Sequence, residues 1–187
     1  GPWAGPVMAG AVWINPALSS SLPLEIRDSK KLTPSKREYI HKALTYLDIA
    51  MAIGRADVEE IDRLNILNAT FLAMERACIN LQKKIDRNIQ TILVDGNRKP
   101  IFKVISEQIN RIPIINGDNI SLSIAAASII AKQTRDSYMC DLHSRHPEYG
   151  FNRHKGYGTK FHRLALAEFG PTPHHRSSFA PIRALKS

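Results

Sequence analysis

The chain has 187 residues, of which 43% are hydrophobic, and this length suffices for one core of ordinary size but not for two comfortable domains. Its 26 Lys and Arg residues outnumber its 17 Asp and Glu residues, and the formal net charge of +9 favours a polyanionic partner such as nucleic acid, because each neutralised phosphate releases condensed counterions. Two cysteines without CxxC spacing give no sign of a zinc site or a disulfide framework, and no apolar run approaches the ~20 residues of a membrane span, so we expect a cytoplasmic protein.

Predicted strands and helices alternate along the chain. Short apolar runs bounded by turn residues predict strands, whereas apolar residues at helical spacing after a capping residue predict helices. The clearest start signal is Thr33-Pro34, an N-cap residue followed by proline at the first helical position. In chain order, the predicted elements are a strand at 6–14, a helix at 35–47, a strand at 48–55, a short helix after Asp57, a helix at 66–81, strands at 89–94 and 112–115, and helices at 119–142 and 160–169.

This alternation predicts an α/β sandwich, although alternation alone does not fix the order of the strands. No internal repeat or low-complexity tract divides the sequence. We therefore expect one domain over residues 1–187, with a core at 1–142 and a basic C-terminal segment at 143–187 that binds the substrate.

The basic charge is concentrated in residues 143–187. This segment holds eight Lys and Arg residues against Glu148 and Glu168, and it holds six of the seven histidines. Charge alone fits a solvated basic tail as well as it fits a nucleic-acid-binding surface. Six aromatic residues are interleaved with the basic ones, however, and a disordered tail carries fewer aromatics, so we expect this segment to fold.

Two aspartates follow predicted strands and form the candidate catalytic centre. Asp95 comes directly after the strand at 89–94, and Asp118 follows the strand at 112–115 and precedes a long helix. Taken singly, each is better explained locally, Asp95 as part of an Asp-Gly turn and Asp118 as a turn or N-cap residue. Taken together inside a basic chain, they supply the hard oxygen ligands that a Mg²⁺-dependent phosphoryl-transfer site needs. Both interpretations stay open at this point.

Three further motifs are weak on their own. Asp28-Ser29-Lys30-Lys31-Leu32 lies on a loop where Lys and a hydroxyl can hold a phosphate, although paired lysines are more often simply solvated. Gly156-Tyr157-Gly158-Thr159 leads into the helix at 160–169, where backbone N–H groups can meet a phosphate and the tyrosine ring can stack on a sugar or base; a turn with a packed tyrosine is the alternative. His174-His175 lacks a third ligand at metal spacing, so we interpret it as loop.

Six sequence blocks, in this order, resemble bacterial ribonuclease HII over nearly the whole chain. They are GPWAGPV at 1–7, DSKKL at 28–32, EEIDRLNILNATFLAM at 59–74, VDGNR at 94–98, SIAAASIIAKQTRD at 123–136 and YGFNRHKGYGT at 149–159. Any single block is compatible with chance, but six blocks in register are highly specific.

The resemblance implies a ribonuclease H-like fold, a mixed five-stranded sheet flanked by helices. It implies an endonuclease that hydrolyses the RNA strand of RNA–DNA hybrids and cuts 5′ of ribonucleotides embedded in duplex DNA. In such an enzyme four carboxylates bind two Mg²⁺ or Mn²⁺ ions, and in-line attack by water leaves a 3′-hydroxyl and a 5′-phosphate. Asp95 matches the third of these carboxylates and Asp118 the fourth. Tyr157 matches the tyrosine that stacks at the RNA-to-DNA junction.

Other positions carry weaker assignments from the same resemblance. Gly1 matches the last glycine of the family's Gly-Arg-Gly motif, which belongs to the substrate-binding region. Ser29 and Lys30 match phosphate contacts, and we predict substrate binding by Lys155 as well. Asp136 belongs to a recurrent block, but we interpret it as a structural residue that anchors a neighbouring arginine. We expect the protein to act as a monomer.

The sequence departs from the family pattern at its start. In the family, Asp-Glu, one variable residue and Gly-Arg-Gly precede the proline that corresponds to Pro2, so the first two carboxylates have no counterpart in these residues. We therefore expect the 187 residues to be an N-terminally incomplete part of the natural protein, with little activity on their own. The alternatives are a non-catalytic nucleic-acid-binding module and another nuclease or recombinase of the same fold. The coding sequence immediately upstream separates the first two hypotheses.

Overall fold

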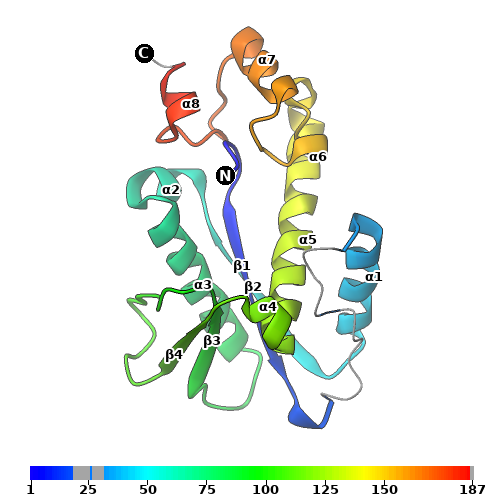
Figure 1. The fold of residues 1–187 in the computed structure, drawn as a ribbon, viewed down its shortest axis with the longest axis vertical. Coiled ribbons are helices and arrows are strands. Elements are labelled where there is room, and N and C mark those ends of the chain that lie inside the picture. The colour runs from blue at the N-terminus through cyan, green and yellow to red at the C-terminus, as the bar shows by residue number, and fades with distance from the viewer. Residues whose placement is uncertain (19–25, 27–31, 186–187) are drawn as a thin grey trace. The chain divides into compact units, whose positions relative to one another are not determined.

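The computed structural model describes residues 1–18, 26 and 32–185, which form alternating strands and helices (Figure 1). The strands are β1 (Val7–Ile14), β2 (Ile49–Ala56), β3 (Thr91–Asp95) and β4 (Asn110–Ile114). The α-helices are α1 (Pro34–Thr45), α2 (Val58–Leu64), α3 (Ile66–Gln82), α4 (Gly117–Ile120), α5 (Leu122–Arg145), α6 (Phe151–His154), α7 (Lys160–Phe169) and α8 (Ala180–Arg183), with 3₁₀ helices η1 (Pro16–Leu18) and η3 (Pro147–Tyr149). This order confirms the predicted α/β class, and each predicted strand and helix has a counterpart.

The chain divides into two compact units. Unit 1 comprises Gly1–Val7, Ala56–Thr70 and Thr134–Ser187, and unit 2 comprises Met8–Arg55 and Phe71–Gln133. The basic segment at 143–187 therefore shares unit 1 with the first seven residues of the chain. The expected boundary after residue 142 falls inside α5, and the single-domain organisation stays a prediction.

The described strands pair in two two-stranded sheets, β1 with β2 and β3 with β4. β3 and β4 run parallel and lie side by side in Figure 1, with Asp95 opposite Ile114, and residues 96–109 make the crossover that parallel strands require. A single five-stranded sheet was expected, whereas the described residues contain four strands in two pairs. A strand joins a sheet only where its backbone forms hydrogen bonds with a neighbouring strand. In the described part of the chain, neither pair forms such bonds with a further strand.

Two helices begin at the predicted capping residues. The Thr33 side chain accepts a hydrogen bond from Lys36 N–H at 3.3 Å, and proline occupies the start of α1, where its missing N–H costs no hydrogen bond. Asp57 is the N-cap of α2, and its N–H donates to Glu60 Oε2 at 3.0 Å. No helix among the described residues is both long enough and apolar enough to cross a membrane.

The core of unit 2 lies between α1 and the first half of α5. Ile40 and Leu44 of α1 pack in one cluster with Ala125, Ala126 and Ile129 of α5, and all five side chains are at most 1% exposed. The alanines are small enough to let the helix approach a strand closely, as the sequence predicts. A Cβ atom added to Gly10 of β1 would lie 2.3 Å from the backbone carbonyl oxygen of Ala127 in α5.

Gly54 of β2 marks a second close approach in unit 2. A Cβ atom at this position would lie 2.0 Å from Ala73 O and 2.3 Å from Ala77 N, which are backbone atoms of α3. Backbone atoms of a hydrogen-bonded helix cannot move aside as the end of a flexible side chain can. The contact between β2 and α3 therefore depends on glycine at this position.

We predict that Gly54→Ala lowers the free energy of unfolding by about 1–3 kcal/mol, because the added methyl group overpacks a tight contact. Urea titration followed by circular dichroism measures this change. Gly1→Ala is the matched control, since no atom lies within 4 Å of a Cβ built on Gly1. Equal midpoints for the two variants would contradict the predicted close packing.

Candidate active site

Parallel pairing brings Asp95 and Asp118 to one edge of the β3–β4 sheet in unit 2. Asp95 is the last residue of β3 and lies opposite Ile114, the last residue of β4. Gly96 N–H donates to Ile114 O at 2.9 Å, and Gly117 N–H donates to Asp95 Oδ1 at 2.9 Å. Since Asp118 follows Gly117 directly, the hydrogen bond ties the two carboxylate-bearing turns together.

The turn before Asp118 has the geometry of a tight strand-to-helix connection. Asn116 is the N-cap of α4 and adopts the left-handed region at φ 54°, which asparagine tolerates better than most residues. A Cβ atom on Gly117 would lie 2.7 Å from Ile124 Cδ1 and 3.4 Å from Asp95 Oδ1. The N-cap interpretation of Asp118 is therefore wrong, because Asn116 occupies that position. Asp118 lies in the first turn of α4, where a negative charge is favourable.

The two aspartates differ in exposure. Asp118 is 1% exposed, whereas Asp95 is exposed at the end of β3. Oxygen ligands of this kind are what Mg²⁺ and Mn²⁺ prefer, and Mg²⁺ is commonly held by one or two carboxylates together with substrate phosphates and water. The described residues bring no group of three or more His, Cys, Asp or Glu side chains together at a spacing that suits a metal. The aspartate pair thus fits a divalent cation in ligand type and supplies part of a complete ligand set.

The predicted substrate-binding tyrosine lies in unit 1. Tyr157 N–H donates to His154 O at 2.9 Å, and Thr159 N–H donates to Tyr157 O at 2.8 Å, so the backbone of this residue is fixed in a turn before α7. Its side chain is 50% exposed. The turn interpretation and the stacking interpretation are therefore compatible, because a fixed backbone presents a half-exposed ring that is available to a sugar or base.

The N-terminal segment (residues 1–7) packs against the GYGT segment (residues 156–159) within unit 1. Trp3 N–H donates to Gly156 O at 2.7 Å. A Cβ atom on Gly156 would lie 2.6 Å from Ala4 O, and a Cβ atom on Gly158 would lie 2.1 Å from Trp3 Cζ2. Two of the sequence blocks, at opposite ends of the chain, thus form one structural unit, and the two glycines allow this contact.

Two arginines hold the N-terminal segment in place, a role that sequence analysis did not assign to either of them. Arg135 donates to the carbonyl oxygens of Pro6, Lys155 and Ala4 at 3.2, 3.0 and 3.1 Å. Arg176, which is 2% exposed, donates to two carbonyl oxygens of the same segment at 3.0 and 3.3 Å. A planar guanidinium with five N–H donors suits this role, since it satisfies several carbonyl groups at once.

The surroundings of Arg135 also bear on two predicted residues. Burial lowers the pKa of Arg135, and the negative charge of Asp136 opposes this shift, which agrees with a structural role for Asp136 beside the arginine. The Lys155 ammonium group donates to Asn152 O at 2.6 Å and to a cysteine sulfur at 3.1 Å. Its role in substrate binding stays a prediction.

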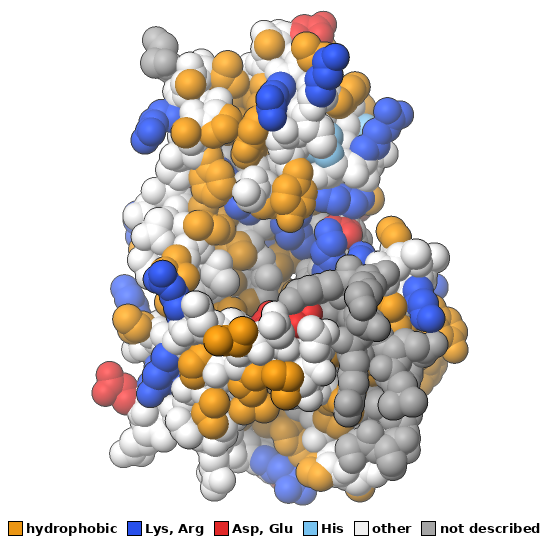
Figure 2. Space-filling model, in the orientation of Figure 1, with side chains coloured by type: hydrophobic (Ala, Val, Ile, Leu, Met, Phe, Trp, Pro, Cys, Tyr) orange, Lys and Arg blue, Asp and Glu red, His pale blue; other side chains and the backbone are white. Residues whose placement is uncertain are grey.

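Basic and hydrophobic side chains are interspersed on the surface over α6 and α7 (Figure 2). Arg153, Lys160 and Arg163 are exposed there, and the Arg163 guanidinium lies 5.6 Å from the centre of the Trp3 ring. This composition suits contact with a phosphate backbone. Gly1 is exposed with no atom within 4 Å of a Cβ position, while Ser29 and Lys30 lie outside the described residues.

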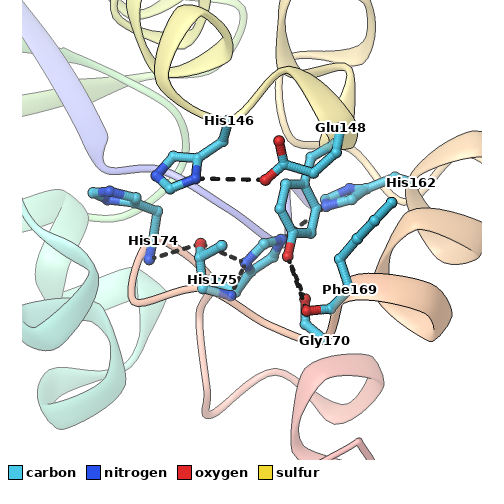
Figure 3. Close-up of polar contacts among 9 residues, drawn as sticks. His146, Glu148, His162, Phe169, Gly170, His174 and His175 are labelled. Carbon is cyan, nitrogen blue, oxygen red and sulfur yellow. Dashed lines mark hydrogen bonds and ion pairs between the residues drawn. The ribbon is translucent and has the colours of Figure 1, made fainter.

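The histidine pair at 174–175 lies in the loop after α7, as predicted, but one of its members is part of a buried cluster (Figure 3). His175 is 1% exposed, and its Nε2 lies 3.0 Å from Nε2 of His162, which is fully buried. Sequence analysis missed His162 because a histidine inside an amphipathic helix carries no local signal of its partner.

Comparison with known proteins gives a consistent result. The family model described as Ribonuclease HII matches residues 1–182. The curated Ribonuclease HII of Ehrlichia chaffeensis is 47% identical over 185 residues, which cover 99% of this chain and 83% of that protein. The ribonuclease H2 structure from Pyrococcus horikoshii matches with a TM-score of 0.74 at 24% identity, over 100% of this chain and 92% of that one. A Bst-RNase HIII structure in complex with Mn²⁺ has a TM-score of 0.81 at 18% identity, over 100% and 66% of the two chains. These structures confirm the ribonuclease H-like fold.

We predict that Gly158→Ala displaces the Trp3 ring. In a Trp13→Phe background Trp3 is the only tryptophan, and its fluorescence emission should shift to longer wavelength, because the added methyl group occupies the place of the indole. Gly170→Ala is the control, since it adds the same methyl group where no atom lies within 4 Å of the new Cβ; φ is positive at Gly170 but not at Gly158, so the control also tests for an effect of backbone strain. An unchanged emission maximum in the Gly158 variant would refute the predicted contact.

Proposed function

The chain belongs to the ribonuclease HII family, and from this premise we propose that Asp95 and Asp118 form part of its catalytic centre. The protein is a ribonuclease H-type endoribonuclease that cleaves the RNA of RNA–DNA hybrids. The observation that carries the proposal for its active site is the hydrogen bond from Gly117 N–H to Asp95 Oδ1, which fixes the two acidic turns at one sheet edge. Nothing in the comparisons favours a non-catalytic binding module.

The proposed cofactor is a divalent cation, Mg²⁺ or Mn²⁺. The ligand type of the aspartate pair supports this choice, as does the Mn²⁺ complex of the similar Bst-RNase HIII structure. When bound, such ions activate water and neutralise charge on the scissile phosphate. The two aspartates would hold the ion through carboxylate oxygens. The Gly117 N–H group orients one Asp95 oxygen, so that the carboxylate does not need to be reoriented when the ion binds.

The proposed substrates are RNA–DNA hybrids and duplex DNA that contains ribonucleotides. Tyr157 would stack its half-exposed ring at the RNA-to-DNA junction, while exposed basic residues of α6 and α7 contact phosphates. The predicted cut lies 5′ of the ribonucleotide and leaves a 3′-hydroxyl and a 5′-phosphate. We also propose that the protein acts as a monomer in the cytoplasm and that Gly1 and Lys155 contact the substrate.

We predict that Asp95→Asn and Asp118→Asn each slow metal-dependent cleavage by at least about 100-fold, because even the loss of a group that supports a metal ligand costs about 10- to 100-fold. The assay follows a duplex with a single embedded ribonucleotide in Mg²⁺, with the complete gene product as enzyme. Asp141→Asn, on an exposed part of α5, is the matched control and should keep full activity. Full activity of either catalytic-site variant would overturn the assignment, and binding without any cleavage by the unmodified protein would point to the non-catalytic alternative.

We further predict that Tyr157→Ala lowers kcat/KM on the same duplex by about 5- to 150-fold, which corresponds to the loss of one stacked base or sugar contact at about 1–3 kcal/mol. Tyr157→Phe should keep most of the activity, because it retains the ring. Tyr39→Ala removes an equally large ring from an exposed site on α1 and serves as the control. If Tyr157→Ala cleaves as fast as the control, stacking by this residue is refuted.

A further inference from the structure

Two buried histidines lie behind the GYGT segment in unit 1. His162 belongs to α7, and His175 follows in the loop after that helix; both are at most 1% exposed (Figure 3). Their Nε2 atoms are 3.0 Å apart. Two imidazoles at this distance share one proton in a hydrogen bond, so one ring donates and the other accepts.

The direction of the hydrogen bond follows from the groups at its two ends. Thr172 N–H donates to His175 Nδ1 at 2.9 Å, and a backbone N–H group can only donate. In the neutral ring His175 therefore carries its proton on Nε2 and donates to His162 Nε2. At the other end, His162 Nδ1 lies 3.0 Å from Tyr157 O, which can only accept. His162 therefore carries its proton on Nδ1 and accepts at Nε2.

Both ends thus require the same direction. A single chain of hydrogen bonds runs from Thr172 N–H through His175 and His162 to the carbonyl oxygen of Tyr157. It occupies all four ring nitrogens, so neither histidine offers a nitrogen to a metal ion or a substrate. A proton added to either ring would place two N–H groups face to face. Burial lowers the pKa of His162 to about 4 and of His175 to about 3, which keeps both rings neutral near pH 7.

The chain ends on the residue proposed to contact the substrate. Tyr157 O accepts from two donors, Thr159 N–H at 2.8 Å and His162 Nδ1–H at 3.0 Å, so both of its acceptor sites are used. The neighbouring His154 ring stacks on His162 at 4.5 Å between centres. It accepts from Gly156 N–H at 3.2 Å and lies 2.7 Å from a second backbone carbonyl. The backbone on both sides of the Tyr157 side chain is therefore attached to histidines.

We propose that His162 and His175 are positioning residues that fix the backbone of Tyr157 and so set the orientation of its ring for the substrate. This inference rests on the proposed substrate contact of Tyr157. A ring held in its bound orientation loses less conformational freedom on binding than a mobile one, and contacts on rigid supports are more precise than contacts on free loops. The histidines act through Tyr157 and touch no reacting atom.

A double-mutant cycle tests this role. His162→Phe keeps the aromatic volume and removes the donor to Tyr157 O, and we expect it to lower kcat/KM on the single-ribonucleotide duplex by about 2- to 10-fold, the worth of one hydrogen bond. His162→Asn places an amide N–H near the former Nδ1 position and should restore part of the loss. In the Tyr157→Ala background, His162→Phe should have no further effect, because the ring to be positioned is gone. An equal loss in both backgrounds, or no loss with Tyr157 present, overturns the proposal.

His146→Phe is the matched control, since it makes the same substitution in unit 1 outside the hydrogen-bonded chain. Nitrogen-15 NMR of labelled histidine gives a second readout that needs no activity. It should find the proton of His175 on Nε2 and that of His162 on Nδ1 at pH 7, and the opposite tautomers would overturn the chain. Failure of the proposed function is distinguishable, because the unmodified protein would then not cleave, whereas failure of this inference leaves cleavage and the effect of Tyr157→Ala intact.

Discussion

The parallel pairing of β3 with β4 is the constraint on which the candidate active site depends. Because both strands run in the same direction, their last residues meet at one edge, and the register places Asp95 opposite Ile114. The next turn then has to close within two residues, and it does so through a left-handed Asn116 and a glycine whose N–H reaches the Asp95 carboxylate. A slip of one residue in this register would turn the Asp95 side chain to the other face of the sheet and break the bond to Gly117.

Unit 1 holds an exposed aromatic ring on a backbone that many hydrogen bonds fix in place. The ring of Tyr157 is half exposed, whereas the backbone of the GYGT segment is held by the N-terminal segment and by the histidine pair, and Arg135 and the buried Arg176 hold the N-terminal segment in turn. The guanidinium groups of Arg135 and Arg176 donate hydrogen bonds to backbone carbonyl oxygens. Without these donors, a loop-rich region would bury the carbonyl groups without partners. The neutral histidines add a hydrogen bond to the Tyr157 carbonyl oxygen, and its direction is fixed by the tautomers of the two rings.

Local sequence signals predicted the elements well and their contacts poorly. Thr33-Pro34, the apolar run before Asp95 and the limits of α7 each depend on neighbouring residues, so they were predictable, and the same signals put both aspartates at strand ends. The resemblance to ribonuclease HII then identified Asp95 and Asp118, whose local sequence patterns are ambiguous, as a candidate active site. The contacts of Arg135 and Arg176 with the N-terminal segment join residues 129 to 171 positions apart, and no local pattern encodes such a partner. The arrangement of the four described strands in two separate pairs was not predictable for the same reason, because strand pairing joins distant segments.

The central claim is that Asp95 and Asp118 act together at one metal site. Diffraction from crystals of the complete gene product soaked in Mn²⁺ tests it directly, since anomalous scattering locates the ion without any assay of activity. We expect an anomalous peak within coordination distance, about 2 Å, of carboxylate oxygens from both residues. Ordered carboxylates at Asp95 and Asp118 that contact no ion, in crystals where Mn²⁺ occupies other positions, would contradict it.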